Sequence, residues 1–415
     1  MFVKLLEKSI RHGTLRVQLP DGSTRTFGSG PPEVTWRIHS GRAVRRILRD
    51  PDLQLGETYV EGLWDVDGDD LVGLLEVLLR SFSDRRRSAG PRSRWLTWIV
   101  GAWQQWNRIA RSYRNASHHY DLDEHLFRSF LDEDLQYSCA YFPRPGMSLE
   151  EAQRAKCEHI ARKLLLEPDM RVLDIGSGWG GLALFLAGRC GARVTGLTLS
   201  GEQLRVARAR AAEMGLQDRV AFRLEDYREH RGRYDRIVSV GMFEHVGRPH
   251  YGQFFRRVQG MLEPHGVALI HTIGRTSPPG TTNPWIRKYI FPGGYIPALS
   301  EVSRGIEDTA LLTTDVEVLR LHYAATLAEW SRRFREARPR ISRRMGERFC
   351  RMWAFYLAAS EASFRWDDMV VFQIQLALDH AAVPLTREYQ YPHGVELAAG
   401  EGGRPRAGGG ALLSN

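Results

Sequence analysis

The expected fold follows from one stretch of the chain, Val172-Leu173-Asp174-Ile175-Gly176-Ser177-Gly178-Trp179-Gly180-Gly181. A short apolar run leads directly into closely spaced glycines. Such glycines allow a tight turn, and they let a ligand approach the backbone at the N-terminus of the following helix. The spacing also fits a dinucleotide fingerprint, so the stretch alone leaves the ligand open.

Short apolar runs alternate with helical stretches beyond this point. Strands are expected at 171–175, 193–197, 236–240 and 266–273, with helices at 180–188 and 201–214. This order predicts a mostly parallel sheet with helices on both faces. Ligands of such sheets bind beyond the carboxyl ends of the strands, which is where site residues are expected.

Two features favour S-adenosylmethionine over a dinucleotide. Asp174, two residues before the first glycine, can neighbour an ammonium group. The second strand runs into Thr198-Leu199-Ser200 without the acid that binds an NAD ribose, which leaves Gln203 as the polar candidate. We therefore expect a class I S-adenosylmethionine-dependent methyltransferase with a Rossmann-like α/β sheet, with a Rossmann dehydrogenase and a structural glycine turn as alternatives. The cofactor-binding residues predicted in this region are Asp174, Gly176, Gly178, Gly180, Thr198, Leu199, Gln203, Asp226 and Tyr227.

Two later strands carry residues suited to acid–base chemistry. Glu244 follows the strand at 236–240, and His271 lies within the strand at 266–273. Both segments should open onto the cofactor crevice, so we expect Glu244 and His271 to lie close together. A histidine after an apolar strand is, by itself, more often a structural residue than a catalyst.

A lone cysteine lies in the expected loop Tyr137-Ser138-Cys139-Ala140-Tyr141-Phe142. Reactive thiolates need a base or a helix terminus that lowers their pKa. No histidine or lysine adjoins Cys139 in the sequence, so its sulfur need not react.

These segments combine with three others: Tyr289-Ile290-Phe291-Pro292-Gly293-Gly294, His322-Tyr323-Ala324 and Phe372-Gln373-Ile374-Gln375. In this order the set resembles the cyclopropane-fatty-acyl-phospholipid synthases and the related mycolic acid cyclopropane synthases, over about residues 110–390. Four residues in three places depart from the family pattern. Asp123-Glu124 replaces a common Gly-Asn pair, Ser177 replaces a frequent cysteine, and Ser360 excludes a catalytic thiol that has been proposed at that position in some members.

The resemblance implies a specific chemistry. Methyl transfer from the sulfonium to a cis alkene leaves a carbocation, which closes to a cyclopropane when a base removes a proton from the new methyl group. Family members hold a bicarbonate ion for that step. The implied contacts to the ion are the side chains of Glu244, His271 and Tyr323 and the backbone of Cys139 and Ile273, while Tyr137 and Ser138 fall on the cofactor side. A fatty-acyl methyltransferase giving a methyl or methylene branch is the alternative, and a noncatalytic lipid-binding protein is a rival from another class.

The chain is expected to divide into four parts. Residues 1–80 form a smaller N-terminal α+β module, with a hairpin around Pro20-Asp21-Gly22 and a helix at 71–79. A basic, tryptophan-rich helical linker follows at 81–118, and the methyltransferase domain covers 119–395. Within that domain, helical insertions at 275–312 and 325–365 should cover the acyl chain, lined in part by Phe334, Phe349, Met352, Trp353, Phe355 and Tyr356. A glycine-rich flexible tail is expected at 396–415.

The net charge of +9 is concentrated in one segment. Residues 80–114 hold nine arginines and a single acid, Asp84, and the tryptophans there recur at helical spacing. Arginine is attracted to anionic lipid and tryptophan prefers the headgroup layer, so the segment predicts contact with a membrane surface. A core-facing helix with a solvated basic side remains the alternative, and no motif accompanies the charge to indicate nucleic acid.

The cysteines and the hydropathy of the sequence indicate where the protein is located. Four cysteines without paired spacing, and no recognisable signal peptide, favour a reducing cytoplasm. No apolar run reaches the roughly 18 to 20 residues of a membrane span. The expected setting is the inner face of the membrane, with unsaturated phospholipid as substrate, S-adenosylmethionine and bicarbonate as cofactors and no metal site. A homodimer is one option for the oligomeric state.

Overall fold

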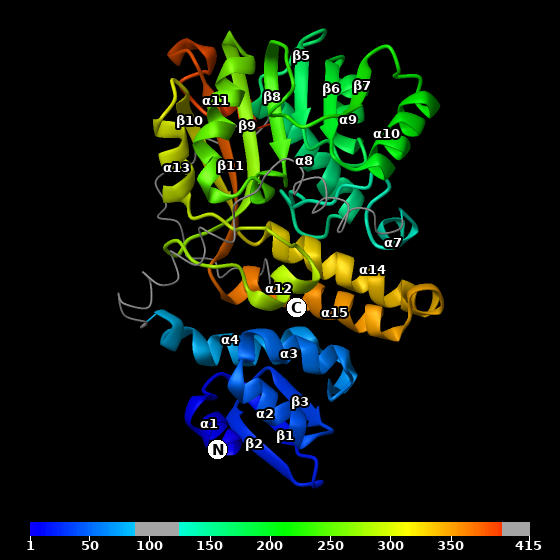
Figure 1. Cartoon of the computed structure of the whole chain (residues 1–415), viewed down its shortest axis with the longest axis vertical. Helices are drawn as coiled ribbons and strands as arrows, with labels where there is room; N and C mark the ends of the chain where they lie inside the picture. Colours follow the sequence, from blue (N-terminus) through cyan, green and yellow to red (C-terminus); the bar gives the residue numbers. More distant parts are fainter. Residues whose placement is uncertain (88–123, 392–415) are drawn as a thin grey trace, which may run out of the picture.

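The computed structural model describes residues 1–87 and 124–391. Its larger part is a seven-stranded sheet in the order β10-β11-β9-β8-β5-β6-β7 (Figure 1). The strands are β5 (Arg171–Ile175), β6 (Arg193–Thr198), β7 (Val220–Leu224), β8 (Tyr234–Val240), β9 (Leu262–Arg275), β10 (Leu312–Leu319) and β11 (Met369–Ala377). Strands β5 to β9 pair in parallel, whereas β11 runs antiparallel to both β9 and β10. The predicted mostly parallel α/β sheet is confirmed.

Helices cover both faces of this sheet, as expected. One face carries α8 (Leu149–Lys163), α9 (Gly181–Cys190) and α10 (Gly201–Glu213), and the other carries α11 (Tyr251–Met261) and α13 (Leu299–Glu307). Local sequence defines where these helices begin. Ser148 and Glu151 form a capping box at the start of α8, and Gly180, with φ of 84°, is the N-cap of α9. The turn between β5 and α9 therefore has the geometry that its glycines predict.

Apart from α13, the helices of the expected insertions form a layer below the carboxyl ends of the strands. The layer consists of α12 (Pro284–Tyr289), α14 (His322–Met345) and α15 (Glu347–Trp366) (Figure 1). The insertion at 325–365 is helical almost throughout, as predicted. The insertion at 275–312 is largely loop instead of helix. Pro278-Pro279-Gly280 stands just before the short helix α12, and such residues do not continue a helix. A short helix α7 (Glu124–Arg128) precedes the loop that contains Cys139.

The N-terminal module, residues 1–87, contains α1 (Phe2–Ser9), β1 (Gly13–Gln18), β2 (Thr24–Ser29), β3 (Glu33–Ile38), α2 (Gly41–Arg49), α3 (Pro51–Val60), β4 (Trp64–Val66) and α4 (Leu71–Arg87). Its sheet has the order β2-β1-β3-β4, and β1 and β2 form the predicted hairpin. Helix α4 continues through the expected boundary at residue 80. The rest of the predicted basic linker, from residue 88, and the predicted tail lie outside the described residues.

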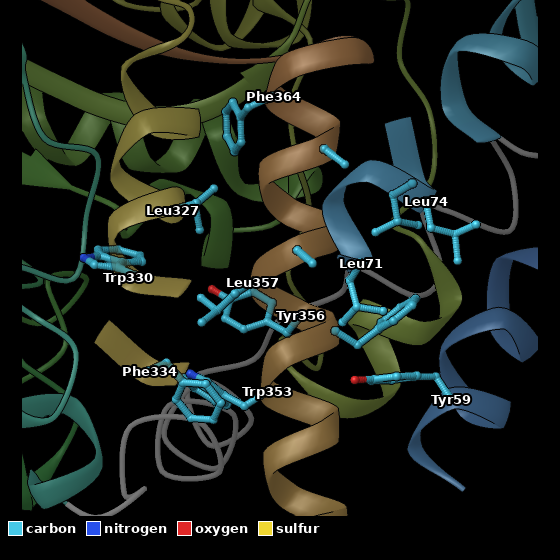
Figure 2. Close-up of a cluster of buried hydrophobic side chains, with 14 of the residues drawn as sticks. Tyr59, Leu71, Leu74, Leu327, Trp330, Phe334, Trp353, Tyr356, Leu357 and Phe364 are labelled. Carbon is cyan, nitrogen blue, oxygen red and sulfur yellow. The ribbon is translucent and has the colours of Figure 1, made fainter. Parts of the chain in front are cut away.

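The hydrophobic core of the N-terminal module continues into the helical layer. Its apolar side chains belong to the same buried cluster as those of α14 and α15. Figure 2 shows Tyr59, Leu71 and Leu74 on one side of α15, with Leu327, Trp330 and Phe334 on the other. The module is therefore packed onto the helical layer by a shared hydrophobic core. Within residues 1–87 and 124–391, no helix combines the length and the hydropathy that a membrane span requires.

Candidate active site

A first cavity, of about 160 Å³, lies at the carboxyl ends of β5, β6 and β8. We call it the cofactor cavity. The glycine turn after β5 forms its floor, with Gly176 at φ of 86° and Gly178 at φ of 54°. A Cβ added at Gly178 would meet no atom within 4 Å, whereas one at Gly176 would lie 2.8 Å from Met242. The turn therefore needs glycine for its backbone conformation and leaves open space for a ligand.

Ten of the predicted cofactor-binding residues line this cavity: Tyr137, Ser138, Asp174, Gly176, Gly178, Thr198, Leu199, Gln203, Asp226 and Tyr227. Gly180 is not among the lining residues. It faces away from the cavity, where an added Cβ would lie 2.8 Å from Phe222 and 2.9 Å from Ala207. Its role in the structure is the close packing of α9 on its neighbours.

The polar groups of the cofactor cavity fit S-adenosylmethionine. The Asp174 side chain is 1% exposed, and among the described residues its Oδ2 has no hydrogen-bond partner. Burial raises the pKa of Asp174 to about 7, although the Lys156 ammonium acts in the opposite direction. An ammonium group in the cavity would supply the missing partner and favour the carboxylate. Gln203, the residue predicted to bind the ribose, lines the same cavity, and its Oε1 accepts from Thr198 Oγ1 at 2.8 Å.

A second cavity, of about 730 Å³, lies between the sheet and the helical layer. We call it the substrate cavity, and its size is within the roughly 300–1,000 Å³ typical of small-molecule sites. All five predicted catalytic residues line it: Cys139, Glu244, His271, Ile273 and Tyr323. It shares Tyr137, Ser138, Gly241 and His245 with the cofactor cavity, so the two cavities adjoin at these residues.

Glu244 is placed just after β8 in a short 3₁₀ turn, Phe243–His245. Its carboxylate Oε1 accepts a hydrogen bond of 2.6 Å from the Ile273 N–H, and its buried Oε2 has no hydrogen-bond partner among the described residues. Burial raises the pKa of Glu244 to about 7, against the lowering effect of the Ile273 hydrogen bond. Near neutral pH a substantial fraction of Glu244 therefore carries a proton and can donate it to an acceptor in the cavity.

His271 and Glu244 line the same cavity, as predicted from their strand ends. The His271 ring is 2% exposed, and the Gln373 side-chain amide pairs with its Nδ1 at 3.1 Å. Burial, helped by Lys156 and Lys163, lowers the pKa of His271 to about 3. The imidazole is consequently neutral at physiological pH, so it can bond an anion without becoming a permanent charge.

Cys139 is fully buried, and its thiol donates to the Ala140 carbonyl at 3.2 Å. Burial raises the pKa of this thiol well above its ordinary value, which disfavours the thiolate that a nucleophile needs. Among the described residues, no hydrogen bond involves the Cys139 N–H. These features favour a role for the Cys139 amide over one for its thiol, and that role stays a prediction.

Aromatic side chains form much of the remaining wall. Tyr323, on α14, contacts the rings of Trp330 and Phe364. Of the six residues expected to line an acyl pocket, Phe355 and Tyr356 do so. The other four, Phe334, Phe349, Met352 and Trp353, pack in or against the hydrophobic core instead. Ser360 also lines the cavity.

The loop between the two cavities is held by residues that the sequence reasoning missed. Lys156 of α8 is fully buried, and its Nζ donates to Gln136 Oε1 at 2.6 Å and to Ser138 Oγ at 2.9 Å. Gln153, one turn earlier, donates to the carbonyls of both Gln136 and Ser138. The available signal was a lysine on the buried side of an amphipathic helix, a position that charged residues rarely take.

The comparisons with known proteins indicate the family. A family model described as mycolic acid cyclopropane synthetase matches residues 107–374, and a domain family of unknown function matches residues 1–89. The cyclopropane-fatty-acyl-phospholipid synthase of Escherichia coli (strain K12) is 39% identical over 359 residues, which cover 84% of this chain and 88% of that protein. Tuberculostearic acid methyltransferase UfaA1 of Mycobacterium tuberculosis is 37% identical over 390 residues, which cover 89% of both chains. The solved structure of the cyclopropane synthase MmaA2 from Mycobacterium tuberculosis superposes with a TM-score of 0.62 at 33% identity, over 65% of this chain and all of that one.

Proposed function

The chain belongs to the cyclopropane synthase family, and from that premise we propose that it is a cyclopropane-fatty-acyl-phospholipid synthase. It would convert the cis double bond of an unsaturated phospholipid acyl chain into a cyclopropane ring. One observation carries the proposal. The cavity that fits S-adenosylmethionine adjoins a large, mostly apolar cavity that gathers all five predicted catalytic residues.

S-adenosylmethionine would supply the methyl group, and the residues of this chain would stabilise the positive charge that forms on the substrate. Addition of the methyl group to one alkene carbon leaves a cation on the other. The rings of Tyr323, Phe355 and Tyr356 line the substrate cavity, where aromatic faces can stabilise a cation and keep water away from it. Ring closure then needs a proton to leave the new methyl group as its C–H electron pair forms the second ring bond.

A bicarbonate ion is the proposed acceptor of that proton. The raised pKa of Glu244 supports this proposal, because an ionised Glu244 would repel a bound bicarbonate, whereas a protonated one can donate a hydrogen bond to it. A protonated Glu244 can donate through Oε2 to such an ion, and a neutral His271 and the Tyr323 hydroxyl can add hydrogen bonds. The Cys139 N–H has no acceptor within the described residues, whereas the Ile273 N–H donates to Glu244 and would act through that carboxyl.

The deciding experiment incubates the purified protein with labelled S-adenosylmethionine and vesicles of unsaturated phospholipid. Mass spectrometry of the lipids should show the addition of one CH2 with loss of the alkene. Vesicles of saturated phospholipid are the control, and they should remain unlabelled. A product that gains CH2 but keeps its unsaturation would assign the branching reaction instead, an outcome of interest because UfaA1 is named a methyltransferase. No incorporation, with the cofactor bound, would overturn both.

We also propose that the protein works at the inner surface of the membrane, through the basic segment 80–114. Each arginine near an anionic surface contributes on the order of 1 kcal/mol, so replacing Arg85, Arg86 and Arg87 by serine should weaken vesicle binding by up to about 3 kcal/mol. The matched control replaces Arg42, Arg45 and Arg49, which are exposed on α2. Co-sedimentation with anionic vesicles at low and high salt measures the effect, which should shrink in high salt. Equal binding of wild type and both variants at low salt would refute the proposal.

A further inference from the structure

The N-terminal module reaches into the substrate cavity. Three residues of α3 line this cavity, Pro51, Asp52 and Leu55, and two of α4 do so, Leu75 and Leu79. The family that matches this part of the chain is one of unknown function. The module therefore contributes directly to a cavity whose catalytic residues all come from the methyltransferase domain.

The contact between the module and the helical layer is close-packed. A Cβ added at Gly56 of α3 would lie 2.5 Å from Trp285 Nε1 and 2.7 Å from Phe355 Cε1. Trp285 of α12 and Phe355 of α15 both line the substrate cavity. The backbone of α3 thus lies directly against two cavity walls, and it can do so only because residue 56 lacks a side chain.

Polar contacts hold the module in this orientation. Glu57 Oε1 accepts from Lys288 Nζ at 2.5 Å and from the Tyr289 hydroxyl at 3.0 Å. Arg351 of α15 donates to the Tyr59 carbonyl at 2.7 Å, and its guanidinium lies 4.0 Å from the centroid of the Tyr59 ring. Together with the shared core in Figure 2, these contacts make α3 and α4 a fixed wall of the cavity.

We propose that the N-terminal module is the distal wall of the acyl-chain site and that Leu55, Leu75 and Leu79 determine which chain lengths fit. The inference rests on the proposed function of the substrate cavity. Among the catalytic residues, His271 and Ile273 lie in β9 and Glu244 lies just after β8, whereas α3 and α4 lie on the far side of α12 and α15 from this sheet (Figure 1). An acyl chain that extends from the reaction centre across the cavity would therefore end against leucine side chains. Because leucine offers no polar group, these side chains can distinguish acyl chains only by their length.

Helix α4 offers a matched pair of variants. Leu79 lines the cavity, whereas its neighbour Leu78 does not, and both are half-buried leucines packed against the same core. Vesicles containing palmitoleoyl, oleoyl and eicosenoyl phospholipids in equal amounts would serve as competing substrates for the full-length protein. Leu79→Trp should lower kcat/KM for the longest chain relative to the shortest by about tenfold or more, because a hydrophobic pocket discriminates by that order when methylene groups no longer fit. Leu78→Trp should leave the ratio as in wild type.

Leu79→Ala and Leu55→Ala test the opposite change, an enlarged cavity. They keep the proposal falsifiable if the tryptophan variant fails to fold. Each should move the ratio toward the longest chain. An unchanged ratio in the alanine variants, or equal shifts in Leu78→Trp and Leu79→Trp, would overturn the inference.

A binding measurement separates this inference from the proposed function. A fluorescent fatty acid bound to the protein would be displaced by shorter and longer saturated fatty acids, which needs no turnover. If wild type makes no cyclopropane product, the proposed function fails, but a length preference in displacement that shifts in Leu79→Ala would still support the module as the chain wall. Displacement independent of chain length in wild type and variant would reject it.

Discussion

Glu244→Gln should make the protein more stable at alkaline pH while it loses activity. The carboxyl is 8% exposed, and its Oε1 accepts from the Ile273 N–H at 2.6 Å. Glutamine has nearly the same shape and keeps that acceptor, but it cannot ionise. The substitution therefore removes the charge of the side chain and little of its packing.

The size of the effect follows from the pKa of Glu244, which burial raises from 4.5 to about 7 in the folded protein. Below pH 4.5, the pKa of Glu244 in the unfolded chain, the carboxyl is protonated in both the folded and the unfolded state and does not destabilise the folded protein. Between about pH 4.5 and about pH 7 the unfolded chain releases this proton while the folded protein keeps it, so the folded protein loses stability as the pH rises, and above about pH 7 the loss stays constant. At about 1.4 kcal/mol for each pH unit, the variant should be more stable than wild type by about 3 kcal/mol above pH 7, and about equally stable near pH 4.5.

Urea unfolding of both proteins without cofactor, at about pH 4.5 and about pH 8, measures this difference. Asp174 also has a raised pKa, but it is present in both proteins and its contribution cancels in the comparison. Turnover of the variant should fall by roughly 10²-fold or more, the range of a lost acid–base contribution. A stability difference that stays constant with pH would refute the assigned ionisation, and wild-type turnover in the presence of bicarbonate would refute the role of the carboxyl.

Three further substitutions test the site. Cys139→Ser should retain substantial activity because its N–H remains, and loss of turnover in a folded, cofactor-binding variant would instead implicate the thiol. Lys156→Met removes both hydrogen bonds to the loop between the cavities. In steady-state kinetics kcat/KM should fall at least tenfold, and in urea unfolding the free energy of unfolding should fall by about 2 kcal/mol. Unchanged kinetics would show that the loop does not need these hydrogen bonds. Gly178→Val places a side chain in the cofactor cavity and should weaken binding of S-adenosylhomocysteine at least tenfold by calorimetry, whereas Gly215→Val, with a φ of 66° and open space, is the control; equal affinities would argue against the cofactor assignment.

Several parts of the fold and site could be predicted because they depend on local sequence. The strand expected at 171–175 is observed as β5, and the glycine turn after it lines the cofactor cavity. A tight turn constrains its own residues, so Asp174 and Gly178 could be placed without knowledge of the rest of the chain. The five catalytic residues came from a family resemblance, and the strand ends that carry Glu244 and His271 explain why these two residues line the same cavity. Strand β7 and the antiparallel pair β10–β11 were not predicted, because a short apolar run beside a long helix does not show which strand it pairs with.

Only the tertiary structure decided what surrounds these residues. Leu79 and Leu78 are alike in sequence, yet only Leu79 lines the substrate cavity, because the direction of a side chain matters only once α4 is packed against α15. The same holds for Lys156, whose partners Gln136 and Ser138 lie 20 and 18 residues away. The raised pKa of Glu244 arises from burial by segments that are distant in sequence. Local patterns determine helices, strands and turns, whereas cavities and burial are properties of surfaces that exist only after those elements pack together.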